Sequence, residues 1–170
     1  AMAMKQHRWM VGMVLGLVMV GQTAVRAEVG TSAGGAKPAA PAQPAGAASE
    51  YDFGNFTSET LTVKAWDALK AEDWAALDAY TKKCVELYEK KALEQAQSLT
   101  DFAPNDQVFT YWAMNDVATC RFIRGKALLA QGKTKDGQAE LNLVIDTFPF
   151  AQAWDPQGWF WKVAQGANDV

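Results

Sequence analysis

The residues from Gly125 to Pro149 constrain the possible fold more than any other part of the chain. A helical pattern follows Gly125, a Gly132-Lys133 pair interrupts it, and a second helical pattern runs up to Pro149. Glycine at a helix end accepts a left-handed backbone conformation, and proline cannot continue a helix. A connection this short makes the two helices antiparallel neighbours. We therefore expect a helical hairpin over these residues.

The rest of the chain after residue 50 also carries the apolar periodicity of helices. Leu61 and Ala65, for example, are four positions apart and fall on one helix face. Asp155, with Pro156 at the first helical position, indicates a short helix up to about Gly166. The other predicted helices cover residues 58–71, 74–99, 106–131 and 134–148. Because no segment carries a strand pattern, we predict an all-α fold of antiparallel hairpins with about five helices, the last a short aromatic capping helix.

Residues 1–27 have the layout of a secretory signal peptide. Basic residues precede an apolar run that begins at Trp9, and the tripeptide Val25-Arg26-Ala27 offers small residues at the usual cleavage spacing. Residues 1–3 come before Met4, and we interpret them as an expression remnant or an upstream start. We expect the mature protein to be periplasmic or extracellular. The alternative is an uncleaved anchor, since residues 9–25 form an uncharged stretch whose length is at the lower limit for spanning a membrane.

Between the signal peptide and the folded domain, residues 28–50 consist mostly of Ala, Pro and Gly. Such a segment buries too little apolar surface to offset the entropy of ordering it, so we expect a disordered linker before a domain at 51–170. Cleavage after Ala27 removes three basic residues and His7, the only histidine. The mature chain then has 13 Lys and Arg against 19 Asp and Glu, a formal charge of −6. An acidic surface argues against nucleic acid as a partner.

Residues 118–151 resemble one 34-residue tetratricopeptide repeat. The matching positions are the glycine and the residue three further on, the inter-helix turn, the small residue at the helix crossing, the packing residue after it, and the terminal proline. These are Gly125, Leu128, Gly132, Gly137, Leu141 and Pro149. Helices that cross closely need a small residue where they meet, which explains Gly137. The chain departs from the family at Arg121 and Arg124, where the repeat has tryptophan and leucine.

Upstream, residues 65–87 resemble a degenerate second repeat, with Glu72-Asp73-Trp74 at the turn. This match is farther from the better one than a single repeat length. The resemblance implies an atypical, non-catalytic tetratricopeptide-like module that binds a protein or a peptide. In this family the partner usually lies in a groove lined by the first helix of each hairpin. By resemblance, that groove would draw on the first and third helices, and its candidate residues are Lys64, Asp67, Arg121, Arg124 and Leu128.

The positions of the two cysteines bear on how the second and third predicted helices pair. With the intervening turn centred near Phe102, Cys84 precedes the centre and Cys120 follows it by the same number of positions. Both helices rise by about 1.5 Å per residue, so an antiparallel pair brings the two sulfurs to the same height. Both cysteines also fall on the expected inner faces, which for the third helix includes Phe109. In an oxidising compartment this predicts a disulfide, and the alternative is two buried free thiols.

Aromatic residues are concentrated near the C-terminus, where Trp154, Trp159 and Trp161 lie close together in the sequence. One interpretation is that they cover the open end of the helical array, because aromatic side chains usually supply core area. The other is an exposed patch for a partner, a peptide or a sugar. The second interpretation gives an alternative function, a carbohydrate- or peptide-binding module that uses this tryptophan cluster.

The sequence does not favour catalysis or a cofactor. The exported chain would lack histidine, and it has no CxxC motif, so neither a metal nor a haem site is expected. Only carboxylates could act as acids or bases, and candidates such as Asp67, Asp73, Asp116 and Asp155 fall at helix starts or on polar faces. We therefore expect a binding protein. A third possibility is a structural subunit of a membrane complex, held by an uncleaved N-terminal helix.

Overall fold

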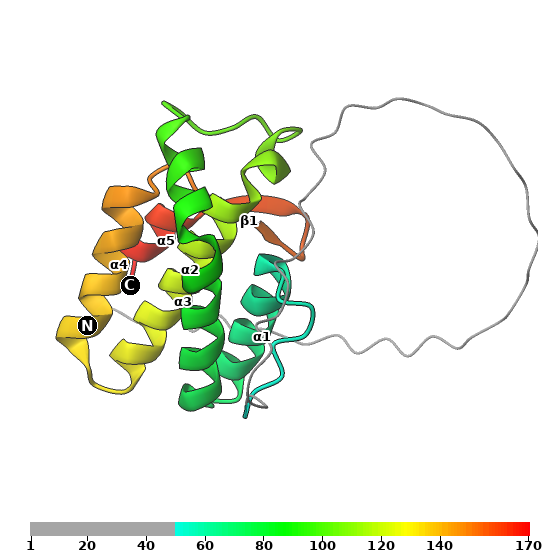
Figure 1. The fold of residues 1–170 in the computed structure, drawn as a ribbon. Coiled ribbons are helices and arrows are strands. Elements are labelled where there is room, and N and C mark those ends of the chain that lie inside the picture. Colours follow the sequence, from blue (N-terminus) through cyan, green and yellow to red (C-terminus); the bar gives the residue numbers. More distant parts are fainter. Residues whose placement is uncertain (1–49) are drawn as a thin grey trace, which may run out of the picture. The chain divides into compact units, whose positions relative to one another are not determined.

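The computed structural model describes residues 50–170, so the predicted signal peptide and the predicted linker up to residue 49 lie outside the described residues. The five α-helices of this part are α1 (Ser58–Lys70), α2 (Trp74–Gln97), α3 (Trp112–Ala130), α4 (Thr134–Thr147) and α5 (Val163–Asn168). Figure 1 shows α1 to α4 alongside one another, and each of them packs against the next. The predicted all-α class, built from antiparallel helical hairpins, is confirmed. None of the helices within residues 50–170 is long and apolar enough to cross a membrane.

The turn between α1 and α2 is stabilised by two backbone hydrogen bonds. The amides of Glu72 and Asp73 donate to the carbonyl oxygens of Leu69 and Ala68, at 3.2 and 3.0 Å. Glu72 adopts a left-handed conformation with φ 55°. The Asp73 carboxylate then accepts a hydrogen bond from the amide of Ala76 at 3.0 Å, which caps the start of α2.

The turn between α3 and α4 repeats this arrangement. The amides of Gly132 and Lys133 donate to the carbonyl oxygens of Leu129 and Leu128, both at 2.9 Å. Gly132 has a positive φ of 74°, as Glu72 does in the first turn. The two helices of each hairpin are therefore connected by the same kind of turn. Gly132 occupies the left-handed position in one turn and Glu72 occupies it in the other.

Substitutions at the two left-handed positions should show that glycine is tolerated better than other residues at both. A β-carbon at Gly132 would meet no atom within 4 Å, so Gly132→Ala changes only the backbone preference. We expect Gly132→Ala to lower the free energy of unfolding by about 1 kcal/mol, and Glu72→Gly to leave it unchanged or raise it by up to about 1 kcal/mol. Urea denaturation followed by circular dichroism measures both, and a loss in both variants would contradict the shared turn geometry.

The helices α3 and α4 cross at two glycines. A β-carbon on Gly125 would lie 2.8 Å from the side chain of Leu141 and 3.2 Å from the carbonyl oxygen of Gly137. A β-carbon on Gly137 would lie 2.9 Å from the carbonyl oxygen of Gly125. The structure thus places Gly137 where the sequence argument puts the small crossing residue. The helix α4 ends at Thr147, shortly before Pro149.

The predicted fifth helix over residues 155–166 is wrong, as is the prediction that the chain has no strand. An antiparallel hairpin occupies this region, with β1 (Gln152–Asp155) paired to β2 (Trp159–Lys162) and Trp154 opposite Phe160. Pro156 lies in its loop, where the amide of Gly158 donates to the carbonyl oxygen of Asp155 at 2.9 Å. Gly158 has φ 108°, a conformation that suits glycine alone and allows the tight loop. The aromatic residues that follow Gly158 favour a strand over a helix. The helix α5 begins only after the hairpin.

The third helix also begins later than predicted. A short 3-10 helix, η1 (Val108–Tyr111), precedes α3, because buried amide side chains take up the backbone groups of this segment. Gln95 donates to the carbonyl oxygen of Thr110 at 3.0 Å and accepts from the amide of Met114 at 2.9 Å. Asn115 donates to the carbonyl oxygen of Val108 at 3.0 Å. Phe109 is consequently 68% exposed, and its predicted place on the inner face is wrong.

The core is organised around α3, which packs against α1, α2, α4, α5 and β1. The main cluster joins α3 to side chains of α1, α2, α4 and α5, and Phe148 is its largest fully buried member. A second cluster joins α1 and α2 to the C-terminal half of α3 through Ile123 and Ala127. The helix α3 therefore positions the other helices and β1 relative to one another.

Candidate functional site

The two arginines of the predicted groove belong to an ion-pair network that connects three helices. Arg121 binds Glu89 of α2 and, at 2.8 Å, Glu140 of α4. Arg124 binds Asp78 of α2 at 3.2 Å and Glu140 at 3.4 Å. These contacts hold both α2 and α4 to α3. The positive charge that could attract an acidic partner is therefore already neutralised within the domain.

Arg121 is the most buried member of this network. Its side chain is 12% exposed, and that of Glu140 is 14% exposed. Burial alone lowers the pKa of the Arg121 guanidinium, but the hydrogen bonds and charges of Glu89 and Glu140 outweigh burial and raise the pKa above its usual value. The guanidinium therefore stays charged in the folded protein, and its role is to join helices.

The remaining groove residues do not join Arg121 and Arg124 in one surface. Lys64 pairs with Asp52 at 3.0 Å, in the segment before α1, and Asp67 is exposed on α1. Leu128 and Arg124 instead line a cavity of about 420 Å³ whose other walls come from α2 and α4. The five predicted groove residues are thus divided between two sides of α3.

The side of α3 that faces α1 is filled by an aromatic side chain of the C-terminal hairpin. Phe122 of α3 contacts Trp66 of α1, with ring centres 6.2 Å apart, and Trp161 of β2, with ring centres 5.2 Å apart. Trp161 also lies against Gly166 of α5, where a β-carbon would come within 2.9 Å of its ring. For Trp161 the structure supports the interpretation of the tail as a cover for the helices.

The other two tryptophans of the tail remain accessible. Trp154 is 51% exposed and Trp159 is 49% exposed. The strand register pairs Trp154 with Phe160 and pairs Trp159 with Asp155, so the two tryptophans project from opposite faces of the hairpin. The predicted aromatic patch of three tryptophans is therefore not one surface.

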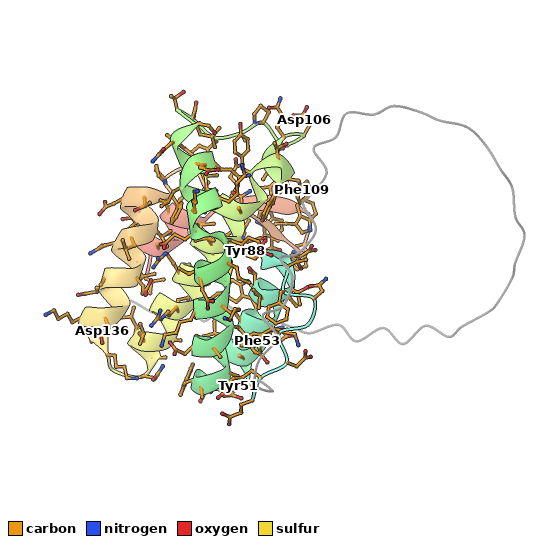
Figure 2. All side chains as sticks on the ribbon, viewed as in Figure 1. Tyr51, Phe53, Tyr88, Asp106, Phe109 and Asp136 are labelled. Atoms are coloured by element: carbon orange, nitrogen blue, oxygen red, sulfur yellow. The ribbon has the colours of Figure 1, made fainter. Side chains whose placement is uncertain are left out.

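A different group of aromatic rings does form one surface, which we call the hairpin patch: Phe109, Trp154 and Phe160. The ring of Phe160 lies 5.0 Å from that of Trp154 and 5.3 Å from that of Phe109. Figure 2 shows Phe109 close to Asp106, at the opposite end of the domain from Tyr51. Sequence reasoning missed Phe109 and Phe160, because the patch exists only once η1 and the hairpin form. The polar run Asn105-Asp106-Gln107 before Phe109 was the one available signal for an exposed segment.

The two cysteines meet between α2 and α3. Both are buried, they belong to the same core cluster, and the Cys120 thiol lies near enough to Cys84 to raise the pKa of Cys84. The hydroxyl of Thr62, from α1, lies 3.3 Å from the sulfur of Cys120. Both residues are free thiols in this structure, so the predicted disulfide stays a prediction.

The carboxylates considered for catalysis have other contacts or are exposed. Asp116 accepts a hydrogen bond from the buried hydroxyl of Ser58, and Asp155 accepts one from the amide of Gln157 at 2.8 Å. Asp73 caps α2, and Asp67 is exposed on α1. Within residues 50–170, no group of three or more His, Cys, Asp and Glu side chains is arranged to hold a metal ion.

Comparison of the chain with protein-family models, with curated proteins and with solved structures gave no match. Residues 50–170 form two antiparallel helical hairpins whose turns have equivalent hydrogen bonds. A β-hairpin follows and adds exposed aromatic rings to the surface of the domain.

Proposed function

We propose that residues 51–170 form a tetratricopeptide-like, non-catalytic module that binds a protein or a peptide, on a protein exported to the periplasm or the cell exterior. The repeat relation is supported by the two turns, which have equivalent hydrogen bonds in the two hairpins. Export is supported by the layout of residues 1–27. An uncleaved N-terminal anchor, with the domain outside the cytoplasm, is the alternative arrangement.

The observation that carries the binding proposal is the exposure of the hairpin patch. Phe109 is 68% exposed and Trp154 is 51% exposed, and both contact the ring of Phe160 between them. Large aromatic side chains that are exposed to water and grouped at one place are typical of a contact site for a partner. The hairpin is attached to α3, since Asn115 accepts a hydrogen bond from the amide of Gln152 in β1 at 2.9 Å.

The orientation of the rings favours a protein or peptide over a sugar. The planes of Phe109 and Trp154 are inclined to that of Phe160 by 65° and 67°. A sugar ring stacks on a flat aromatic face, whereas these mutually inclined rings form an uneven apolar surface. Apolar side chains of another protein can fill such a surface, and so we assign the patch to a protein or peptide partner.

The partner should depend on the patch and not on exposed apolar residues in general. We expect the double variant Phe109→Ser with Trp154→Ser to weaken binding by about 30-fold or more, because aromatic side chains at the centre of an interface commonly contribute about 2 kcal/mol or more. The measurement is quantitative mass spectrometry of proteins crosslinked to the full-length chain in its native source. The affinity of the best candidate is then measured with purified components.

The matched control is Leu143→Ser on α4, which removes another exposed apolar side chain, 44% exposed, from a different face. A partner recovered by the unmodified chain and by the control, but lost from the double variant, supports the proposal. Equal recovery in all three would overturn it. If soluble oligosaccharides quench the tryptophan emission of the unmodified chain but not that of the double variant, the patch binds carbohydrate instead.

A further inference from the structure

Cys84 and Cys120 form a thiol pair that is enclosed on every side. Cys84 projects from α2 and Cys120 from α3, neither has exposed surface, and the two thiols lie near enough to interact electrostatically. They belong to the main core cluster, together with Leu61 of α1. The two thiols are therefore neighbours in the core, and solvent has no access to them.

Access to the thiols depends on α1. The hydroxyl of Thr62 lies 3.3 Å from the sulfur of Cys120, so α1 covers the pair directly. Two further contacts hold α1 in this position. The hydroxyl of Ser58 donates to the carboxylate of Asp116 in α3, and the hydroxyl of Tyr88 in α2 donates to the carbonyl oxygen of Phe56 at 2.7 Å. Moving α1 away would expose the thiols without separating α2 from α3.

Cys84 is also protected chemically in the folded chain. The neighbouring Cys120 thiol, together with burial, raises the pKa of Cys84 well above its usual value. Thiolate, not thiol, attacks disulfides and electrophiles, so a raised pKa suppresses the reaction at neutral pH. Exclusion of the oxidant and suppression of the thiolate therefore act in the same direction.

We propose that Cys84 and Cys120 are an oxidation site that closes to a disulfide only while α1 is away from α2 and α3. The oxidant is a disulfide, either that of a protein oxidase or oxidised glutathione. The thiolate of one cysteine attacks this disulfide, which forms a mixed disulfide and releases one thiol of the oxidant. The second cysteine then attacks the mixed disulfide, which forms the Cys84–Cys120 bond and releases the second thiol. The chain loses two electrons and two protons, and the oxidant gains both.

By this mechanism, the redox state of Cys84 and Cys120 depends on the conditions under which the chain folds. A chain that folds in an oxidising compartment acquires the bond before α1 closes over it. A chain that folds under reducing conditions keeps two thiols, and later exposure to an oxidant leaves them unchanged on the same timescale. The inference does not depend on the identity of the partner or on the hairpin patch.

The rate of oxidation of the reduced, folded, full-length protein tests the proposal. We expect oxidised glutathione at neutral pH to convert the two thiols to an internal disulfide at least about 100-fold more slowly than in the urea-unfolded chain, because reaction requires a local opening. The reaction is stopped with acid, the remaining thiols are alkylated, and intact mass gives the number that reacted. Oxidation of the folded protein at nearly the unfolded rate would overturn the proposal, as would two glutathione adducts in place of the internal bond.

Two leucine truncations separate opening of α1 from general loss of stability. Leu61→Ala removes a core side chain of α1, and Leu141→Ala removes one of α4 in the same cluster. At urea concentrations that give the two variants equal global stability, we expect Leu61→Ala to be oxidised at least about 10-fold faster than Leu141→Ala. Equal rates would show that global unfolding, and not movement of α1, exposes the thiols. If Leu61→Ala does not fold, Ser58→Ala takes its place, because it removes the contact to Asp116 and leaves the core filled.

Discussion

Gly137→Ala should lower the free energy of unfolding by about 2 kcal/mol. The added methyl group would lie 2.9 Å from the carbonyl oxygen of Gly125 and 2.8 Å from the side chain of Leu129. The leucine can rotate away, but the backbone oxygen cannot, so α4 has to move away from α3. Overpacking of this kind typically costs about 1–3 kcal/mol, against a gain of about 1 kcal/mol from the helix preference of alanine. The upper part of the range applies because a backbone group is the obstacle.

The matched control for this experiment is Gln138→Ala, at the next position of α4, which is exposed. It adds helix preference without a steric contact, and we expect it to change stability by less than about 0.5 kcal/mol. Urea denaturation followed by circular dichroism gives both values. If Gly137→Ala were as stable as the control, the two helices would not approach as closely as described.

Arg121→Met should cost more, about 3 kcal/mol of the free energy of unfolding. Methionine keeps the apolar stem of the side chain but leaves Glu89 without this cation and leaves Glu140 with Arg124 as its remaining partner, at 3.4 Å. Glu140 is 14% exposed, so it regains little hydration when the guanidinium is lost. Removal of one partner from a buried ion pair typically costs about 3–5 kcal/mol, and the half-exposed position of Glu89 places this case at the lower end.

An exposed ion pair of the same protein provides the comparison. Lys91 and Glu94 lie 3.4 Å apart on the surface of α2, with both side chains about half exposed. We expect Lys91→Met to change stability by less than about 0.5 kcal/mol, because water screens the pair and can replace it. If the two substitutions cost the same in urea denaturation, the network around Arg121 would not hold α2 and α4 to α3.

The helices could be predicted because their determinants are local. Apolar side chains that recur every three or four residues define one face, and residues such as Asp73 and Gly132 mark the ends. The shared position of the two cysteines in the core could be predicted as well, since equal distance from a turn fixes equal height in an antiparallel pair. These arguments need no knowledge of the rest of the fold.

The candidate site could not be predicted, because long-range contacts determine it. The Asp155-Pro156 pair suits a helix start as well as a hairpin loop, and the difference depends on whether Trp161 reaches Phe122 of α3. The exposure of Phe109 depends on the buried amide of Gln95, which interrupts the predicted helix. The charges of Arg121 and Arg124 gave no sign of their partners, which lie on the neighbouring helices.

The central position of α3 has a consequence for how the domain responds to stress. In an ordinary array of repeats each unit touches only its neighbours, so one end can melt while the other end persists. Here α3 contacts both hairpins, the β-hairpin and α5, and loss of α3 would remove the packing surface of all of them at once. Apart from the proposed local opening of α1, the described domain should therefore fold and unfold as a single cooperative unit.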